Sequence, residues 1–313
     1  LCESNDLEEV WNLGEQWVVD FVGEGQEGFK APLVVVLCRG CGLAQLKHTV
    51  DRDLMYRHYW YRSGTSETMR KALKDVAMAA VEVGKVKPRD LVMDIGSNDN
   101  TLLNNYHPGV VCIGFEPARN IDTRQKRRSG EPRDLDYYES IDEDERFTVK
   151  DFFSLRAYWT QFPSGKLHRA KAITSVAMFY DVDNPSECIW AIAHLLHPEG
   201  VWINQMNFVG PVMRNNAFDF LSHEHVALWS LPLFVEAVAE VRLEVFDLEE
   251  LPLNGGTYRV YVDRRGYRAI SPRVAEYLAR DAEYSSAEAW KEFKERVDQN
   301  GEHLRSMLEI LRT

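Results

Sequence analysis

The sequence predicts an α/β protein in which a Rossmann-like, mostly parallel sheet follows a small cysteine-containing module and precedes C-terminal helices. From about residue 88 to 262, short apolar runs alternate with segments of helical spacing, as in parallel α/β sheets. A turn with a single glycine, Gly96, follows the first apolar run, and the second run ends in an acid, Glu116. We expect this turn and acid at the carboxyl edge of the sheet, where open α/β sheets bind ligands.

The expected strands are short apolar runs separated by helical segments or turns. Those that end in Leu-Glu-Val-Phe-Asp and Tyr-Arg-Val-Tyr-Val suit a seven-stranded sheet whose last strand is antiparallel. The strands are expected over residues 91–95, 110–115, 147–149, 171–176, 201–206, 242–248 and 257–262.

Segments outside these strands also carry recognisable patterns. Residues 66–85 have helical spacing with Ser66 as the N-cap, and a second helix is expected to begin at Thr101, after the glycine turn. Residues 119–145 are rich in both charge signs and predict a long solvated excursion. Residues 272–312 predict one or two helices with an apolar stripe. The chain therefore divides into residues 1–62, a central domain over 63–264 and a helical segment over 265–313.

Composition restricts the class of protein. The 313 residues carry a net charge of −12, which argues against a broad nucleic-acid-binding surface. The longest apolar runs are too short to span a membrane, and the start of the chain lacks a signal-peptide pattern. An odd number of cysteines, five, favours a reducing compartment, so we expect a cytoplasmic protein. Cys112 and Cys188 lie in apolar segments and are expected in the core.

The other three cysteines form a pattern typical of a structural zinc site. A β-branched run over residues 33–37 predicts a strand that leads into Cys38-Arg-Gly-Cys41, and the turn directs both thiolates to one point. Cys2 is the expected third ligand, and a fourth is expected upstream of Leu1. The alternative is three unconnected thiols.

The segment after the first strand suggests the cofactor. The dinucleotide fingerprint Gly-x-Gly-x-x-Gly is absent, so NAD is the weaker alternative. Asp94 and a one-glycine turn suit the charged amino-acid end of S-adenosylmethionine, and Glu116 can accept both hydroxyls of a ribose. An ordinary strand and turn without a ligand is the other alternative. The expected cofactor residues are Asp94, Gly96, Ser97, Asn98, Asp99, Thr101, Leu102, Glu116, Pro117, Asp151, Phe152 and Ser175.

Motifs spread over nearly the whole chain resemble those of one family. They are Cys38-Arg-Gly-Cys41-Gly42-Leu43, Tyr61-Arg-Ser-Gly-Thr-Ser66, Asp94-Ile-Gly-Ser-Asn-Asp-Asn-Thr-Leu-Leu, Asp151-Phe-Phe153, His223-Glu-His225 and Asn254-Gly-Gly-Thr-Tyr-Arg-Val260. This set resembles the S-adenosylmethionine-dependent sugar C-methyltransferases, which act on dTDP-4-keto-deoxyhexoses and carry an N-terminal four-cysteine zinc module. The resemblance implies a class I methyltransferase fold, S-adenosylmethionine as cofactor, structural zinc, and Asp151 and Phe152 at the edge of the adenine.

Three features differ from that family. Asp181 stands where the family often has a histidine, and Ser222 stands where it often has a tyrosine. The family continues into a further Rossmann-like domain that helps to hold the nucleotide, whereas this chain stops at Thr313. These differences keep O- or N-methylation of another small metabolite open.

The segment 222–225 is the expected acceptor site. Adjacent residues of an extended chain point to opposite faces, so the three side chains of His-Glu-His are not expected to bind one metal ion. We expect His225 to act as a base near neutral pH, with Glu224 orienting or stabilising it. His223 and Tyr61 are the next candidates. The alternative is a hydrogen-bonded, structural His-Glu-His.

The expected function is C-methylation next to a ketone of a nucleotide-linked deoxysugar. The base removes the α-proton, the enolate attacks the methyl group, and no metal takes part in the chemistry. The expected partner is this small molecule, with neither nucleic acid nor membrane. A non-catalytic module that only binds S-adenosylmethionine is the alternative of another class. The aromatic group over residues 56–61 either covers the active site or packs the module onto the core.

Overall fold

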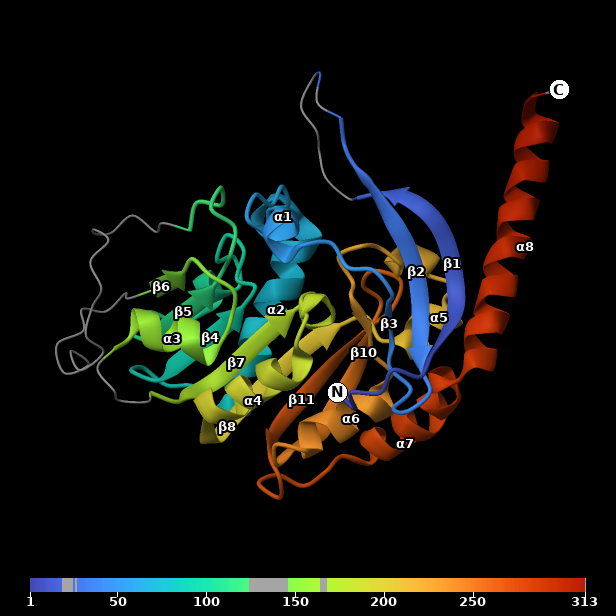
Figure 1. Cartoon of the computed structure of the whole chain (residues 1–313). Coiled ribbons are helices and arrows are strands. Elements are labelled where there is room, and N and C mark those ends of the chain that lie inside the picture. Colours follow the sequence, from blue (N-terminus) through green and yellow to red (C-terminus); the bar gives the residue numbers. More distant parts are fainter. Residues whose placement is uncertain (19–24, 26, 124–145, 164–167, 313) are drawn as a thin grey trace.

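The computed structural model of the chain describes residues 1–18, 25, 27–123, 146–163 and 168–312. Most of the charged excursion expected over 119–145 therefore lies outside the described residues. Two sheets, one of seven strands and one of four, lie side by side (Figure 1). No helix among the described residues is long and apolar enough to cross a membrane.

The larger sheet confirms the predicted fold class. Its strands are β4 (Leu91–Ile95), β5 (Val111–Phe115), β6 (Arg146–Val149), β7 (Ala170–Val176), β8 (Leu196–Met206), β10 (Leu243–Leu251) and β11 (Thr257–Arg264). All seven expected strands are present, although β8 starts earlier than expected. The order is β10-β11-β8-β7-β4-β5-β6, with β11 antiparallel to both neighbours. An antiparallel last strand inserted into a parallel sheet is the class I methyltransferase arrangement.

Helices lie on both faces of this sheet, α2 in one core and α3, α4 and α6 in the other. The helices of the described residues are α1 (Arg52–Tyr56), α2 (Glu67–Gly84), α3 (Leu155–Gln161), α4 (Pro185–Leu195), α5 (Val209–Arg214), α6 (Leu231–Ala239), α7 (Pro272–Asp281) and α8 (Ala287–Arg312). Ser66 caps α2 as predicted, because its hydroxyl accepts the Met69 amide at 3.3 Å. Val76 and Ala80 of α2 are fully buried in the core on one face of the sheet.

The helix expected from Thr101 is wrong. The chain forms only a 3₁₀ turn, η2 (Leu103–Asn105), before β5. Pro108 and Gly109 follow almost at once, and Gly109 has a φ of +89°. Since β5 starts at Val111, the chain has room for a single turn.

The smaller sheet joins the N-terminal module to the central part of the chain. Its strands are β1 (Leu7–Trp17), β2 (Lys30–Cys38), β3 (Ala44–Leu46) and β9 (Ala227–Leu228), paired antiparallel in that order. Strand β9 follows the His-Glu-His segment directly, so this segment is held at the edge of the N-terminal sheet.

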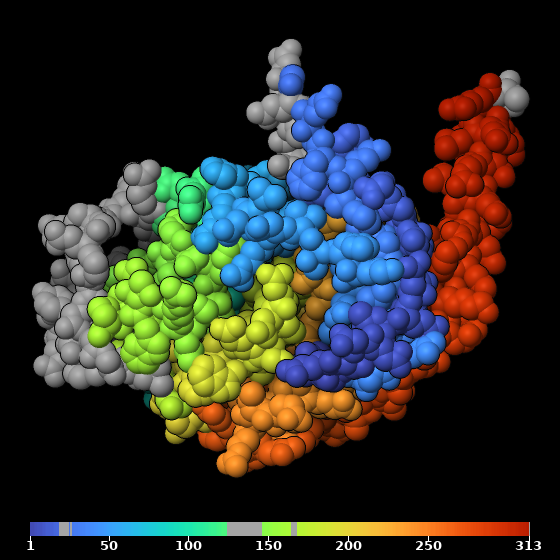
Figure 2. Space-filling model, in the orientation of Figure 1, coloured from blue at the N-terminus to red at the C-terminus, as the bar shows by residue number. Residues whose placement is uncertain are grey.

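The two C-terminal helices are confirmed, and they differ in how much of their surface is covered. The ring of Phe293 on α8 packs edge-on against Trp11 of β1, at 5.4 Å between centroids. The C-terminal half of α8 extends beyond the body, as Figures 1 and 2 show.

A buried carboxylate fixes α7 to the larger sheet. Asp281 is fully buried, and its carboxylate accepts hydrogen bonds from Arg214 at 2.6 Å and from the Tyr258 hydroxyl at 2.8 Å. We expect Asp281→Ala to lower the free energy of unfolding by about 3 kcal/mol, because it leaves Arg214 without its buried partner. Urea denaturation measures this. Asp298→Ala, which removes an exposed partner of Lys294, is the control and is expected to cost less than about 0.5 kcal/mol. Equal losses would contradict the assignment.

Candidate functional site

The predicted cofactor turn lies at the carboxyl edge of the larger sheet. Gly96 follows β4 with a φ of +72°, a conformation that glycine adopts without strain. A Cβ at this position would lie 3.2 Å from the side chain of Met178. Met178 precedes the 3₁₀ turn η4 (Phe179–Asp181) after β7, so Gly96 allows the two loops to approach each other closely.

Glu116 lies beside this turn. It follows β5 and is 5% exposed. Its two carboxylate oxygens accept the amides of Asn98 at 2.7 Å and Ala118 at 2.8 Å. Burial raises the pKa of Glu116, and these two hydrogen bonds oppose that rise. Each oxygen retains acceptor capacity, so the carboxylate fits the two ribose hydroxyls of S-adenosylmethionine.

Three residues of the expected cofactor set are held within the protein. Asp94 accepts the hydroxyl of Thr174 at 2.6 Å, and burial raises its pKa to about 7. The hydroxyl of Ser175 donates to Asn204 and is fully buried. The side chain of Leu102 packs in the core against α2. These positions indicate that Leu102 and Ser175 support the turn from behind.

The remaining turn residues organise its backbone. The Thr101 hydroxyl donates to the Asp99 carboxylate at 2.6 Å. Ser97 is buried, and its hydroxyl occupies the space that a Cβ on Gly114 would fill, at 2.4 Å. Gly114 in β5 is therefore needed for the turn to lie against the strand.

Asp151 and Phe152 lie near Pro117 and are held by arginines. The Asp151 carboxylate accepts Arg57 at 2.9 Å, and the Pro117 carbonyl accepts the same guanidinium at 3.5 Å. The guanidinium groups of Arg52 and Arg57 lie over the Phe152 ring, 4.4 and 4.7 Å from its centroid. An adenine at Phe152 would share this surface with both arginines.

Glu116 offers a direct test of the cofactor site. We expect Glu116→Ala to weaken S-adenosylmethionine binding by roughly ten- to a hundred-fold, because a hydrogen bond to a charged group contributes about 1.5–3 kcal/mol. Calorimetry measures this. Glu187→Ala is the control, since Glu187 lies in the exposed first turn of α4. Equal affinities for parent and Glu116→Ala would remove Glu116 from the site.

The His-Glu-His segment presents its side chains to different surroundings. His223 is 2% exposed, and its Nε2 donates to the carbonyl of Ala31 on β2 at 3.1 Å. Glu224 instead accepts the hydroxyl of Tyr59 at 3.3 Å, and its backbone carbonyl accepts the hydroxyl of Tyr56 at 3.3 Å. His223 therefore anchors the segment to the smaller sheet, and this hydrogen bond favours a structural role over that of a base.

His225 is oriented for one proton-transfer role. Its Nδ1 donates to the carbonyl of Phe220 at 2.5 Å, so Nε2 carries the lone pair. The imidazole packs between the rings of Tyr180 and Phe220, with centroids 4.2 and 4.4 Å away. Burial lowers the pKa of His225 to about 4, so the ring is neutral at neutral pH.

One aromatic segment connects the cofactor turn with Glu224. At its end, the Ser63 amide donates to the Asn98 side chain at 3.0 Å, and the Asn98 side chain donates to the Tyr61 carbonyl at 3.2 Å. At its middle, the Tyr59 hydroxyl donates to Glu224. The segment thus spans the distance between the two expected sites, and Tyr61 lies beside the cofactor turn.

Asp181 belongs to the same group, although the sequence indicated only that it differs from a family pattern. It ends η4, and Oδ1 is buried without a hydrogen-bond partner among the described residues. Burial, followed by the charge of Glu224, raises its pKa well above the ordinary value. The available signal was an acid directly after a central strand, in Phe179-Tyr180-Asp181.

The three N-terminal cysteines converge as predicted. Their sulfur atoms all lie within 4.8 Å of one another, and those of Cys2 and Cys38 are 3.4 Å apart. Gly42, next to Cys41, has a φ of +76°, and its amide donates to the Cys38 carbonyl at 2.8 Å. A cluster of thiols at one point is the donor set of structural zinc, which would be held here by Cys2, Cys38 and Cys41. Cys112 and Cys188 are buried in the core, as predicted.

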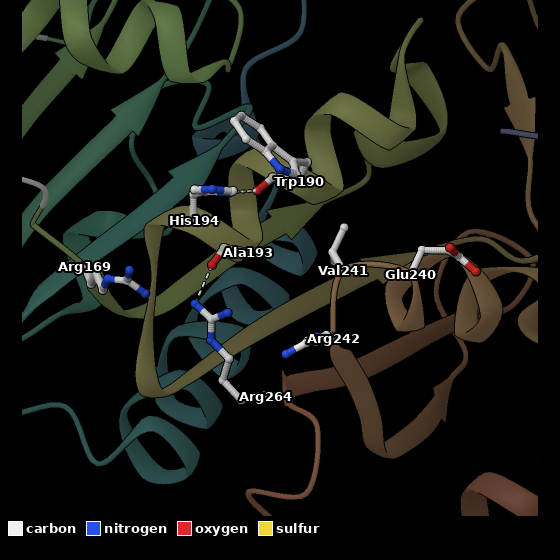
Figure 3. A pocket seen from close by; sticks show the side chains of 8 residues that line it. All are labelled: Arg169, Trp190, Ala193, His194, Glu240, Val241, Arg242 and Arg264. Carbon is white, nitrogen blue, oxygen red and sulfur yellow. Dashed lines mark hydrogen bonds between the residues drawn. The ribbon is translucent and has the colours of Figure 1, made fainter.

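A cavity of about 350 Å³ lies at the opposite edge of the larger sheet (Figure 3). Arg264 donates there to the carbonyls of Ala193 and Leu196, which end α4. Arg169 also donates to Leu196, at 3.4 Å. The two arginines thus satisfy carbonyls at a helix C-terminus, where cations are favourable. The cavity is separate from the cofactor edge.

Comparison with known proteins identifies relatives of both parts of the chain. Residues 1–56 match a family described as "putative zinc binding domain", which confirms the predicted module. C-methyltransferase NovU from Streptomyces niveus is 24% identical over 252 residues, which is 80% of this chain and 56% of NovU. The chain therefore spans little more than half the length of this relative.

Solved structures with similar folds include several methyltransferases. The carbon methyltransferase CurJ is 13% identical and matches with a TM-score of 0.40 over 62% of this chain and 54% of its own. Magnesium protoporphyrin IX methyltransferase from Synechocystis PCC 6803, with bound SAH, is 11% identical, with a TM-score of 0.43 over 62% and 83% of the two chains.

Proposed function

Because the chain is related to the S-adenosylmethionine-dependent C-methyltransferases with an N-terminal zinc-binding domain, we propose that it methylates a carbon next to a ketone. The proposed acceptor is a small molecule, a nucleotide-linked deoxysugar. Residues 63–264 form the methyltransferase domain in this proposal, with residues 1–62 as the zinc module and 265–313 as a helical segment. We place the reaction in the cytoplasm, since an odd number of cysteines, five, favours a reducing compartment.

The observation that carries the proposal is the aromatic segment between the cofactor turn and Glu224. It links Asn98 of the turn to the acid that adjoins His225, through Tyr61 and Tyr59. A histidine with a free Nε2 lone pair next to this segment can remove a proton from a bound acceptor. S-adenosylmethionine, when bound, supplies an electrophilic methyl group.

In this mechanism, residues of the cofactor turn hold the methyl donor, and His225 acts on the acceptor. Glu116 holds the ribose hydroxyls, and Asn98 and Asp99 fix the turn against Ser63 and Gly64. His225 takes the α-proton at Nε2. The charge that favours the imidazolium is that of Asp219 and not, as expected, that of Glu224, whose carboxylate accepts the Tyr59 hydroxyl. The electron pair of the broken C–H bond moves onto the acceptor as an enolate, and the enolate carbon forms the new bond to the methyl group. The aromatic rings of residues 56–61 exclude water from the site of methyl transfer.

Incubation with S-adenosylmethionine and a panel of dTDP-keto sugars tests the proposal. We expect one keto sugar to gain the mass of one methyl group in place of a hydrogen, on carbon, as detected by mass spectrometry and NMR. Methylation of a hydroxyl or amine instead would favour the alternative, an O- or N-methyltransferase. S-adenosylmethionine binding without transfer to any acceptor would favour a non-catalytic module.

A further inference from the structure

Asp181 is a half-buried acid with one fully buried carboxyl oxygen, Oδ1. It lies at the end of η4, one loop away from the cofactor turn, because the neighbouring Met178 contacts Gly96. In the described part of the chain, Asp181 has no ion pair, and its Oδ1 is buried without a hydrogen-bond partner. Leaving a buried carboxyl oxygen unsatisfied costs roughly 1–3 kcal/mol, so a structural role alone does not account for it.

The groups that face Asp181 are tyrosines and another acid. The hydroxyls of Tyr56 and Tyr59 and the ring of Tyr180 lie in the same cluster, and Glu224 is the charged group that acts on Asp181. His225, next to Glu224, is neutral and has its Nδ1 bound to Phe220. No arginine or lysine is among the groups that shift the pKa of Asp181.

Burial raises the pKa of both acids of the cluster, and a tyrosine hydroxyl opposes each rise, Tyr59 at Glu224 and Tyr56 at Asp181. Glu224 accepts the Tyr59 hydroxyl, a contact that favours the ionised form. Asp181 is more strongly affected by burial, and the charge on Glu224 further disfavours a charge on Asp181. When the surroundings of two neighbouring carboxyl groups push their pKa values apart, the group with the higher pKa stays protonated and the other is ionised. Asp181 is the acid.

We propose that the protonated carboxyl of Asp181 donates a hydrogen bond to the acceptor's carbonyl oxygen and stabilises the enolate that forms when the α-proton leaves. This inference rests on the proposed C-methylation and adds a residue to it. A tyrosine beside a neutral carboxylic acid in an apolar site is a known arrangement for enolate stabilisation. Here Tyr56 is the tyrosine that hydrogen-bonds to the Asp181 carboxyl.

The step balances without a further reactant. The α-proton goes to Nε2 of His225, and the C–H electron pair becomes the C=C bond of the enolate. The carbonyl π pair moves to oxygen, where the Asp181 hydrogen bond strengthens as negative charge develops. When the enolate carbon forms its new bond to the methyl group, the sulfur–methyl bond of the donor would break and leave its electron pair on sulfur. The pair on the enolate oxygen restores the carbonyl, and Asp181 keeps its proton throughout.

Two substitutions at Asp181 separate donation from charge. Asp181→Asn keeps an N–H donor of similar shape, whereas Asp181→Leu keeps the size and removes the donor. The assay is α-proton exchange of a dTDP-keto sugar in deuterated water with the methyl donor withheld. Losing an oxyanion donor costs about 10²–10³-fold, so we expect that loss for Asp181→Leu and a loss below about tenfold for Asp181→Asn. Asp183→Leu is the matched control, because Asp183 is an exposed acid of the same segment that contacts Arg52.

The pH profile and the stability give independent readouts. The donor form of Asp181 is present below its raised pKa and is lost as the pH rises through it, so the parent exchange rate should fall on the alkaline side. Asp181→Asn should lack this fall. Asp181→Leu should unfold at higher temperature than the parent, because it removes an unsatisfied buried group. Unchanged affinity for S-adenosylmethionine shows that each variant is folded.

The outcomes are distinguishable. If Asp181→Asn loses as much exchange as Asp181→Leu, Asp181 acts as a charged acceptor of a ligand donor, and the inference is wrong. If both variants exchange at the parental rate, Asp181 has no part in the step. If the parent exchanges no keto sugar but methylates a hydroxyl or amine, the proposed C-methylation fails, and the oxyanion role fails with it.

Discussion

Replacing His225 with alanine is expected to slow methyl transfer about 10²–10⁴-fold, the usual contribution of a general base. Nε2 of His225 is the available proton acceptor, because Nδ1 is bound to Phe220. The expected cofactor residues lie mostly after β4, β5 and β6 and do not include this side chain, so the affinity for S-adenosylmethionine should stay unchanged. Turnover and calorimetry on the same preparation measure the two quantities.

The rate of the same reaction should also fall at low pH, because His225 then becomes protonated. Burial lowers the pKa of His225 to about 4, so the basic form is present above that pH and is lost as the pH falls through it. Substrate-free enzyme should thus show an acid limb near pH 4, and His225→Ala should lack it. Glu224→Gln should cost less than His225→Ala, since the Glu224 carboxylate accepts the Tyr59 hydroxyl and does not take the proton.

Proton exchange identifies the step that His225 serves. With the methyl donor withheld, the parent should exchange the α-proton of the acceptor into deuterated water, and His225→Ala should not. His303→Ala is a control, since His303 lies on the exposed C-terminal half of α8. Exchange at the parental rate in His225→Ala would place the base elsewhere, with Tyr61 the next candidate.

The strands of the larger sheet could be predicted because each is an apolar run that two helical layers bury. Hydrophobic periodicity records that burial directly, as in Leu91–Ile95, where every residue is buried. The helix from Thr101 could not be excluded in this way, because the constraint is the short connection to β5 and not the composition. For Ser175, the sequence predicted a ligand contact where the structure shows an internal hydrogen bond. A polar residue at a strand end suggests a ligand, yet its hydroxyl is used inside the sheet.

The acceptor site was only partly predictable for a topological reason. Tyr59 and Glu224 are 165 positions apart and meet through their side chains. Strand β9, only Ala227–Leu228, is too short for any pattern, but its pairing with β3 turns His223 toward the smaller sheet. Asp181 enters the same cluster from the end of β7. Contacts between separate segments leave no local signal, whereas the one-glycine turn and the Cys38–Cys41 spacing do.

Zinc should copurify at about one atom per chain, and its removal should unfold the N-terminal module. The sulfur atoms of Cys2, Cys38 and Cys41 lie within 4.8 Å of one another, so a bound metal would connect the end of β2 to Cys2. Structural zinc contributes roughly 10–16 kcal/mol of apparent binding free energy in small domains. Metal analysis and circular dichroism during chelation measure the two effects.

Removal of the metal should also disturb the acceptor site and leave the cofactor site intact. Strand β3 pairs with β9, and His223 donates to Ala31 on β2, so the smaller sheet holds the His-Glu-His segment in place. We therefore expect chelation, or Cys38→Ser, to lower turnover while the affinity for S-adenosylmethionine remains close to that of the parent. Cys188→Ser is the matched control, because Cys188 is an equally buried thiol on α4, away from the cluster. A purified protein free of zinc, or equal losses in Cys38→Ser and Cys188→Ser, would show that the three thiols are not a structural metal site.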